Sequence, residues 1–171
     1  MDTDSIKDSI RNYQKSNREI ESIVKNLVRT CCSSLDELVR EVQNTVQDMQ
    51  NPITDEELDF FILNLPIQMY FANEQLELLG LSEDLAKQEK TKKYNEAYSQ
   101  ESGTIADKKN YAESSIRKQQ VVVSIYNRAS KQIKTKIDIA TELLQSLKKV
   151  SSRHMAERNI EMSGYKRIQE D

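Results

Sequence analysis

Residues 112–147 read AESSIRKQQVVVSIYNRASKQIKTKIDIATELLQSL and carry the clearest structural pattern of the chain. Apolar and small side chains recur there at alternating steps of four and three, over ten consecutive steps. A heptad repeat of this kind is typical of a helix that packs along other helices as in a coiled coil. We therefore expect a helix over residues 104–160, with a bundle or oligomer seam formed by Val123, Tyr126, Ile133, Ile137, Leu144 and Leu147.

The N-terminal part of the chain, residues 4–50, shows a similar spacing and predicts another long helix. Its apolar stripe passes through Cys31, which we expect to lie on the buried face. The stripe contains one extra step of four residues between Cys31 and Leu35, which would be a stutter in the heptad repeat. Because proline cannot continue a helix, Asn51-Pro52 marks the end of this first helix.

A second helix is expected over residues 55–99. Thr54 is a suitable N-cap for it, and Glu57 stands at the position that completes a capping box. Pro66 removes one backbone donor, so we expect a kink near that residue. This segment holds all three phenylalanines of the chain and is expected to contribute most to the core through Phe60, Phe61 and Phe71.

The boundary between the second and third helices is a turn at residues 99–104. Thr104 can cap the third helix, with Asp107 at its third position. Towards the C-terminus the apolar pattern fades and Gly164 follows, a residue with low helix propensity. We therefore expect residues 161–171 to form a tail.

Together these elements predict an all-α fold. It would consist of three long helices, the middle one bent, in an elongated antiparallel bundle with coiled-coil-like packing. The length of 171 residues is compatible with one helical domain that spans residues 1–171. The stripes of the first and third helices are longer than the irregular second helix can cover, so we also expect a homo-oligomer.

Composition disfavours several classes of protein. The mean hydropathy is −0.73, and no apolar run approaches the length of about 18 residues that a membrane span needs, so no membrane partner is expected. The N-terminus lacks the basic and apolar parts of a signal peptide, and the adjacent Cys31 and Cys32 favour a reduced compartment. These features predict a cytoplasmic protein.

Catalysis finds no support in the residues. The single histidine, His154, belongs to no metal-binding motif, and the three glycines are too scattered to form a phosphate-binding loop. We therefore expect no catalytic residue, no metal and no cofactor, and we do not expect an enzyme.

Charge is distributed unevenly along a chain whose net charge is −3. Between Asp36 and Asp84 there are 12 acidic residues and one basic residue, whereas between Lys87 and Lys136 there are 12 basic and 5 acidic residues. Tyrosines are interleaved with the basic residues. This pattern suits single-stranded nucleic acid, because the basic residues neutralise phosphates while nucleobases stack on the tyrosine rings. The candidate DNA-binding residues are Lys87, Lys90, Lys92, Lys93, Tyr94, Tyr98, Lys108, Lys109, Arg117 and Lys118.

The order of four segments resembles the UvsY family of phage recombination mediators. These are the run Leu35–Glu41, the capped helix from Ile53, the segment Lys92–Ser99, and the end of the heptad helix near Arg153–Glu157. The resemblance spans roughly residues 35–165. It implies a small, helical, oligomeric protein that binds single-stranded DNA and acts in the host cell cytoplasm if a phage encodes it. Such a protein loads a RecA-like recombinase onto strands coated by a single-strand binding protein.

At the turn, the resemblance is partial. A basic residue that the family carries there corresponds to Lys92, and a second one corresponds to Tyr94, which Lys93 precedes. The family's Gly-Arg-Gly is absent, and this chain has Gln100-Glu101-Ser102-Gly103 instead.

Two classes of function remain open. The first is a non-enzymatic, oligomeric recombination mediator that binds single-stranded DNA. The second is a coiled-coil scaffold, assembly chaperone or inhibitor that binds another protein and no DNA, with the basic block as a solvated face. The second class predicts that alanine at Lys92 and Lys93 leaves activity unchanged, whereas a charge at Ile137 abolishes it. The mediator predicts damage from both changes.

Overall fold

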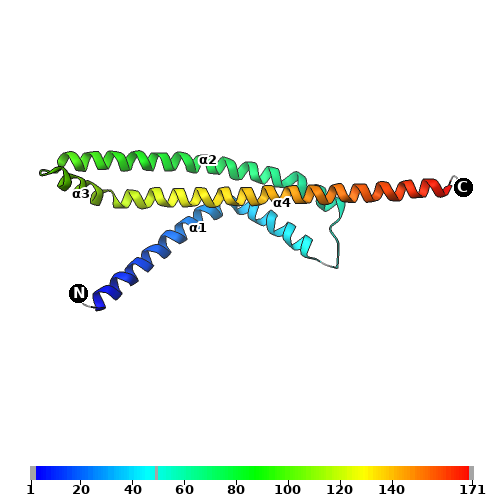
Figure 1. The fold of residues 1–171 in the computed structure, drawn as a ribbon, viewed down its shortest axis with the longest axis horizontal. Helices are drawn as coiled ribbons and strands as arrows, with labels where there is room; N and C mark the ends of the chain where they lie inside the picture. The colour runs from blue at the N-terminus through cyan, green and yellow to red at the C-terminus, as the bar shows by residue number, and fades with distance from the viewer. Residues whose placement is uncertain (1–2, 49, 170–171) are drawn as a thin grey trace. The chain divides into compact units, whose positions relative to one another are not determined.

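The computed structural model describes the backbone of residues 3–48 and 50–169, and the side chains of residues 17–48 and 50–160. Over these residues the chain forms four helices and no strand, which confirms the all-α class. The helices are α1 (Thr3–Gln47), α2 (Asp55–Gln100), α3 (Ile105–Ser115) and α4 (Arg117–Gln169) (Figure 1). No helix in the described part of the chain combines the length and the apolar character needed to cross a bilayer.

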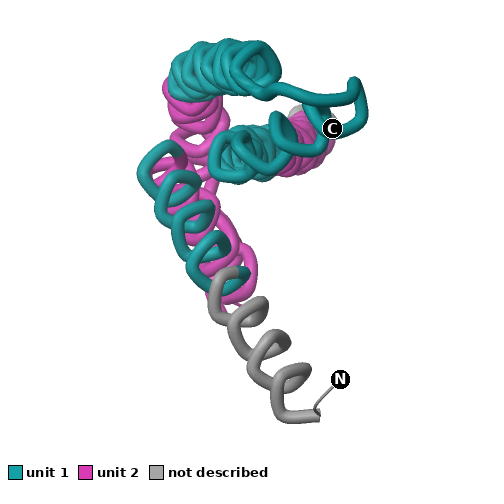
Figure 2. Tube along the Cα trace, turned by 90° about the vertical axis from the view of Figure 1, so that its left-hand side faces the viewer, with its two compact units in different colours: residues 1–31, 74–134 teal, residues 32–73, 135–171 magenta. Residues whose placement is uncertain are grey.

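The chain divides into two compact units, which Figure 2 shows in different colours. Unit 1 consists of residues 1–31 and 74–134, and unit 2 consists of residues 32–73 and 135–171. Each unit therefore draws on segments that are far apart in the sequence.

The expected third helix is divided in two, because α3 ends at Ser115 and α4 begins at Arg117. Ile116 between them has φ −96° and ψ 4°, which is outside the range of an α-helix. The hydroxyls of Ser114 and Ser115 donate to carbonyls three residues back, at 2.7 Å each. Such bonds compete with the hydrogen bonds of the helix backbone. The helix is therefore interrupted at Ile116, although the heptad repeat of the sequence continues through this position. The prediction of one helix over residues 104–160 is therefore wrong.

The C-terminal end of this region also differs from the prediction. α4 continues through Gly164 to Gln169, so the expected tail is wrong for residues 161–169. One glycine costs a helix only about 1 kcal/mol relative to alanine, which is too little to end a long helix. α2 likewise runs through Pro66 and Gly80 without interruption, and the kink near Pro66 stays a prediction.

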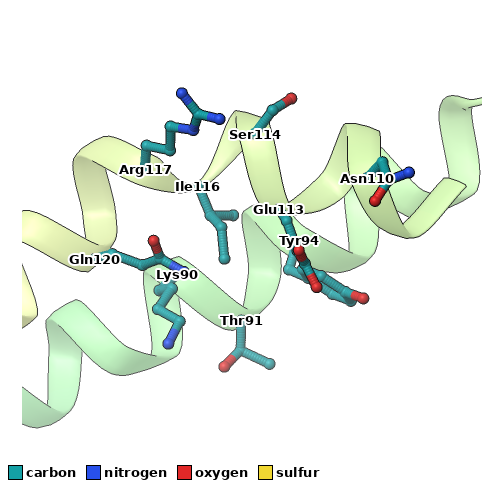
Figure 3. Close-up of a pocket in the computed structure, with 9 residues that line it drawn as sticks. All are labelled: Lys90, Thr91, Tyr94, Asn110, Glu113, Ser114, Ile116, Arg117 and Gln120. Atoms are coloured by element: carbon teal, nitrogen blue, oxygen red, sulfur yellow. The ribbon is translucent and has the colours of Figure 1, made fainter. Parts of the chain in front are cut away.

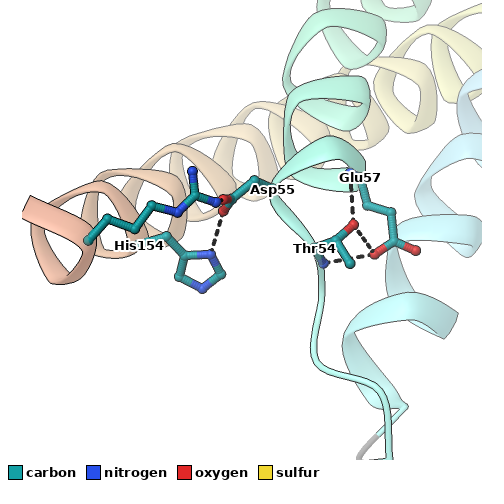
Figure 4. Close-up of polar contacts among 5 residues, drawn as sticks. Thr54, Asp55, Glu57 and His154 are labelled. Atoms are coloured by element: carbon teal, nitrogen blue, oxygen red, sulfur yellow. Dashed lines mark hydrogen bonds and ion pairs between the residues drawn. The ribbon is translucent and has the colours of Figure 1, made fainter. Parts of the chain in front are cut away.

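Both predicted N-caps are present, and each forms a capping box. The backbone N–H of Glu57 donates to Thr54 Oγ1 at 3.2 Å, and the backbone N–H of Thr54 donates to the Glu57 carboxylate at 2.8 Å (Figure 4). Thr104 and Asp107 form the same arrangement at the start of α3. Gly103, directly before this cap, has a φ of 138°, which is strained for any residue with a side chain.

In unit 1, the C-terminal half of α2 lies alongside α3 and the first turns of α4, which run in the opposite direction (Figure 1). Glu83 of α2 is buried there, with 8% of its surface exposed, and accepts a hydrogen bond from the side-chain amide of Asn127 at 3.3 Å. The apolar core of this unit contains Val24, Val28, Leu79, Ala97, Ala112, Ile116, Ile125, Ala129 and Ile133.

In unit 2, ion pairs join the helices around the core. Asp36 of α1 pairs with Lys136 of α4, and Asp55 at the start of α2 pairs with Arg158 of α4. Asp55 also lies 2.8 Å from Nδ1 of His154 (Figure 4). The apolar core of this unit contains Cys32, Leu35, Leu38, Val42, Leu58, Phe61, Leu65, Ala72, Ile137, Ala140, Leu144 and Leu147.

The predicted seam of the heptad helix is found in unit 2 and is shifted in unit 1. Of its residues, Ile133, Ile137, Leu144 and Leu147 are buried within the single chain, while Val123 and Tyr126 are half-buried. In unit 1 the buried positions of α4 are Ile125, Ala129 and Ile133. These three residues recur at steps of four, whereas the predicted seam alternates steps of three and four.

Two further predictions about the core are corrected. Cys32 is buried and Cys31 is half-buried, so the extra four-residue step lies earlier in α1 than the sequence suggested. Of the three phenylalanines, Phe61 alone belongs to the core, since Phe60 is 49% and Phe71 is 52% exposed.

Candidate nucleic-acid interface

A groove in unit 1 brings together part of the predicted DNA-binding set. It has a volume of about 700 Å³ and lies where α2 passes the junction of α3 and α4 (Figure 3). α2 contributes Lys90, Thr91 and Tyr94; α3 and the junction contribute Asn110, Glu113, Ser114 and Ile116; α4 contributes Arg117 and Gln120. Three of the predicted residues, Lys90, Tyr94 and Arg117, therefore line one groove.

The position of Arg117 follows from the break between α3 and α4. Ile116 is buried, 3% exposed, and anchors the junction in the core of unit 1. Arg117 is the first residue of α4 and is exposed beside this anchor. On α2, Lys90 and Tyr94 are four residues apart, so they lie on the same face of the helix.

The two cations of the groove are available for an anion. Among the described side chains, neither Lys90 nor Arg117 takes part in an ion pair. A phosphate that enters the groove would therefore displace no carboxylate from them, and Arg117 could bind two of its oxygens at once.

The aromatic side of the groove is a pair of tyrosines on α2. The rings of Tyr94 and Tyr98 are stacked, with centroids 6.3 Å apart and planes inclined by 19°. Both side chains are half-buried, and Tyr94 lines the groove. Tyr98 stacks on the ring of Tyr94 from the side of the next helical turn. A partly exposed ring of this kind is a suitable surface for a nucleobase.

The other predicted lysines of α2 already have acidic partners. Lys93 pairs with Glu89 at 3.1 Å, and Lys92 lies 4.0 Å from Glu96. Exposed pairs within one helix contribute about 0.3–0.5 kcal/mol each, so a phosphate could replace them at a small cost.

Lys87 has two acidic partners, whereas Lys92 and Lys93 have one each. Its ammonium lies 3.0 Å from Glu83 and 3.1 Å from Asp84. The hydrogen bond that Lys87 donates to Glu83, followed by the one it donates to Asp84, raises the pKa of Lys87. Lys87 and Lys92 line a second, more open pocket of about 570 Å³ on α2, together with Gln88, Thr91, Asn95 and Glu96.

The remaining predicted residues do not line the groove. Lys108 and Lys109 lie on α3, and Lys118 follows Arg117 on α4; Lys109 and Lys118 are exposed, while Lys108 is half-buried. Their charge contributes to the potential of this end of unit 1 without forming a surface of defined shape.

Sequence reasoning missed the polar residues that complete the groove. Thr91, Asn110, Ser114 and Gln120 offer hydrogen-bond donors and acceptors, and Glu113 adds a carboxylate. None of them is basic or aromatic, so a search for cations and rings passes over them. Their spacing carried a usable signal, because Asn110, Glu113 and Ser114 recur at the steps of one helical face.

Comparison of the chain with known protein families, curated proteins and solved structures finds no match. Within the described residues, no group of three or more His, Cys, Asp or Glu side chains is placed to hold a metal ion.

Proposed function

We propose that this protein binds single-stranded nucleic acid through the groove of unit 1. We further propose that it acts as an oligomeric mediator, presenting the strand to a RecA-like recombinase in the presence of a single-strand binding protein. The observation that carries the proposal is that one groove contains two cations that form no ion pair with any described side chain, together with a tyrosine that stacks on a second tyrosine. Cations suit phosphates, and a partly exposed ring suits an unpaired base.

Single strands fit this groove better than a duplex. A base can reach Tyr94 only if it is unstacked from its neighbours and unpaired, which a single strand allows at little cost. Two cations give one groove a modest affinity, so useful binding would come from several copies that hold one strand together.

The proposal is tested by fluorescence anisotropy of labelled oligo-dT with the full chain, at low salt and at about 0.15 M salt. We expect saturable binding that weakens with salt. Lys90→Ala and Arg117→Ala should each weaken it about tenfold, and Tyr94→Leu should cost about 1–3 kcal/mol per stacked base.

Two control variants make this test specific. Lys25→Ala removes an exposed lysine of α1 in the same unit and should leave binding unchanged. Lys109→Ala removes a lysine of the basic block outside the groove and should have a small effect. No binding at low salt, or equal losses from all four basic positions, would contradict the groove as the site.

The alternative is the scaffold, chaperone or inhibitor that binds a protein and no DNA. It gains support from the ion pairs of Lys87, Lys92 and Lys93, which are what a solvated face would show. Failure of oligo-dT to bind even at low salt would favour it.

A further inference from the structure

Unit 2 carries an apolar stripe that no described helix of that unit covers. Along α2, Phe60, Leu63, Ile67, Tyr70 and Phe71 are 49%, 68%, 49%, 65% and 52% exposed. Five large side chains exposed to this degree present on the order of 500 Å² to solvent. This is at the upper end of what monomers leave open, and patches of that size commonly mark interaction sites.

The stripe lies on the side of α2 that points away from the core. The buried residues of this segment are Leu58, Phe61, Leu65 and Ala72. At 3.6 residues per turn, these four positions fall on one face of the helix, and the five exposed positions fall on the opposite face. α2 is therefore apolar on two sides in this unit, and one side alone is needed for its own fold.

An acidic pocket adjoins the N-terminal end of the stripe. It has a volume of about 420 Å³, and its walls include the carboxylates of Glu41, Glu56 and Glu57 and the rings of Phe60 and Phe61. Phe60 thus belongs to both the pocket and the stripe. The two rings meet edge to face, with centroids 5.6 Å apart.

The charges of the pocket are available to a partner. Neither Glu41 nor Glu56 forms an ion pair among the described side chains. Hydrogen bonds from the backbone and side chain of Thr54 lower the pKa of Glu57, so this carboxyl is ionised at neutral pH. A Lys or Arg side chain could place its cation among these carboxylates and against the face of an aromatic ring.

From these features we propose that the stripe docks a basic amphipathic helix of a partner protein. Apolar residues of that helix lie on Leu63, Ile67, Tyr70 and Phe71, and one of its Lys or Arg residues enters the pocket beside Phe60. The spacing of the stripe, at steps of three and four, matches that of a helix laid along it. This surface belongs to unit 2, so the inference holds whether or not the groove of unit 1 binds nucleic acid.

Charge favours a basic helix over two other possible occupants of the stripe, a second copy of this chain and an anionic lipid surface. The four acidic residues of segment 55–73 all lie within 55–59, and the segment has no basic residue, so a second copy laid parallel on the stripe would set carboxylates against carboxylates. The same acids would repel an anionic lipid surface. A cationic helix has the complementary charge and the matching apolar spacing.

The test uses three labelled synthetic helices of about 18 residues, which is five turns. The first has leucines on one face and lysines on its flanks, the second has glutamates in place of the lysines, and the third has serines in place of the leucines. Anisotropy with the full chain should show binding of the Leu/Lys helix alone, and this binding should weaken as salt is raised.

Variants then locate the site. Leu63→Ser, Tyr70→Ser and the double change Glu41→Gln/Glu56→Gln should each weaken the Leu/Lys helix at least about tenfold, as expected at the centre of an interface. All four positions are exposed, so the fold should not depend on them. Ile139→Ser, which removes a 54% exposed apolar residue of α4 in the same unit, is the matched control and should change nothing.

Several outcomes would overturn the proposal. If the Leu/Glu helix or the Lys/Ser helix binds as tightly as the Leu/Lys helix, the surface does not require both the positive charge and the apolar face. Unchanged binding by Leu63→Ser would place the helix elsewhere. If the native chain sediments as an oligomer and the Leu63→Ser variant sediments with a lower mass, a second copy of the chain is the occupant of the stripe.

Discussion

At the scale of single residues, the groove of unit 1 combines attraction with one repulsive group. Lys90 and Arg117 favour phosphate, whereas Glu113 opposes it from the same groove. A carboxylate in a nucleic-acid site is acceptable if it accepts hydrogen bonds from base amino groups. If the groove binds a strand as proposed, Glu113 would contribute to base selectivity at some cost in affinity.

Changing Glu113→Gln should strengthen the binding of oligo-dT. Thymine lacks an exocyclic amino group, and a glutamine oxygen can still accept a hydrogen bond from its N3–H, so the main effect of removing the charge is reduced repulsion of the phosphates. At separations of several Å in a solvated groove, this gain is about 0.5–1 kcal/mol, or two- to fivefold in Kd. Anisotropy at low salt measures it, with Glu77→Gln on α2 as a charge-matched control outside the groove. An unchanged Kd would mean that the strand does not approach Glu113.

Glu83 predicts a pH dependence of stability. It is buried, and a hydrogen bond from Lys87 lowers its pKa from the ordinary 4.5, with a smaller contribution from Asn127 and an opposing one from burial. Because the pKa is lower in the folded than in the unfolded chain, the ionised group stabilises the fold above about pH 4.5. This contribution is lost as the pH falls through the lowered value.

Thermal unfolding of Glu83→Gln should therefore differ from that of the native chain in two ways. At pH 7 the variant should be less stable by about 1 kcal/mol, the usual net value of a lost hydrogen bond. Between about pH 5 and pH 3 its Tm should fall less steeply. The exposed Glu77→Gln serves as the reference. Parallel curves for the native chain and Glu83→Gln would refute the assignment.

At the scale of elements, the sequence predicted those features that depend on spacing alone. Ile137, Leu144 and Leu147 are buried, and Thr54 and Thr104 cap their helices, because heptads and capping boxes are local patterns. The break at Ile116 was not predicted, since it depends on how two serine hydroxyls orient. The second apolar side of α2 was overlooked because the residues of a single helix do not reveal which of two stripes will be covered.

The break between α3 and α4 is itself testable. Alanine at both Ser114 and Ser115 removes the competing hydroxyl bonds and raises helix propensity by about 0.5 kcal/mol at each site. We expect helical content and Tm to rise. Oligo-dT binding should weaken several-fold, because a continuous helix would redirect Arg117 relative to α2.

The control for this prediction uses serines within an unbroken helix. Ser146 and Ser152 donate to carbonyls four residues back inside α4. Alanine at both should give a similar gain in Tm without a change in binding. If the Ser114/Ser115 variant binds oligo-dT as tightly as the native chain does, the break does not position Arg117.

At the scale of the whole molecule, charge is the property that joins sequence to function. A net charge of −3 and a pI of 5.4 would place the chain among proteins that avoid nucleic acid. The local arrangement matters more, since unit 1 presents in one groove two cations that pair with no described carboxylate, and unit 2 presents acids beside an apolar stripe. Two surfaces of opposite charge are what the two proposals require, one for a strand and one for a basic partner.

The salt dependence of binding distinguishes a defined groove from a diffuse basic block. Each phosphate neutralised on a single strand adds about 0.7 to the slope of log K against log salt, so a groove with two cations predicts about 1.4 for a short oligo-dT that occupies one groove. If most of the 12 basic residues between Lys87 and Lys136 contacted phosphates, the slope would be several times larger. Lys90→Ala should lower the slope by about 0.7, and Lys109→Ala should not change it. A steep slope that neither substitution alters would show that the whole basic block binds the strand and that the groove has no special part in it.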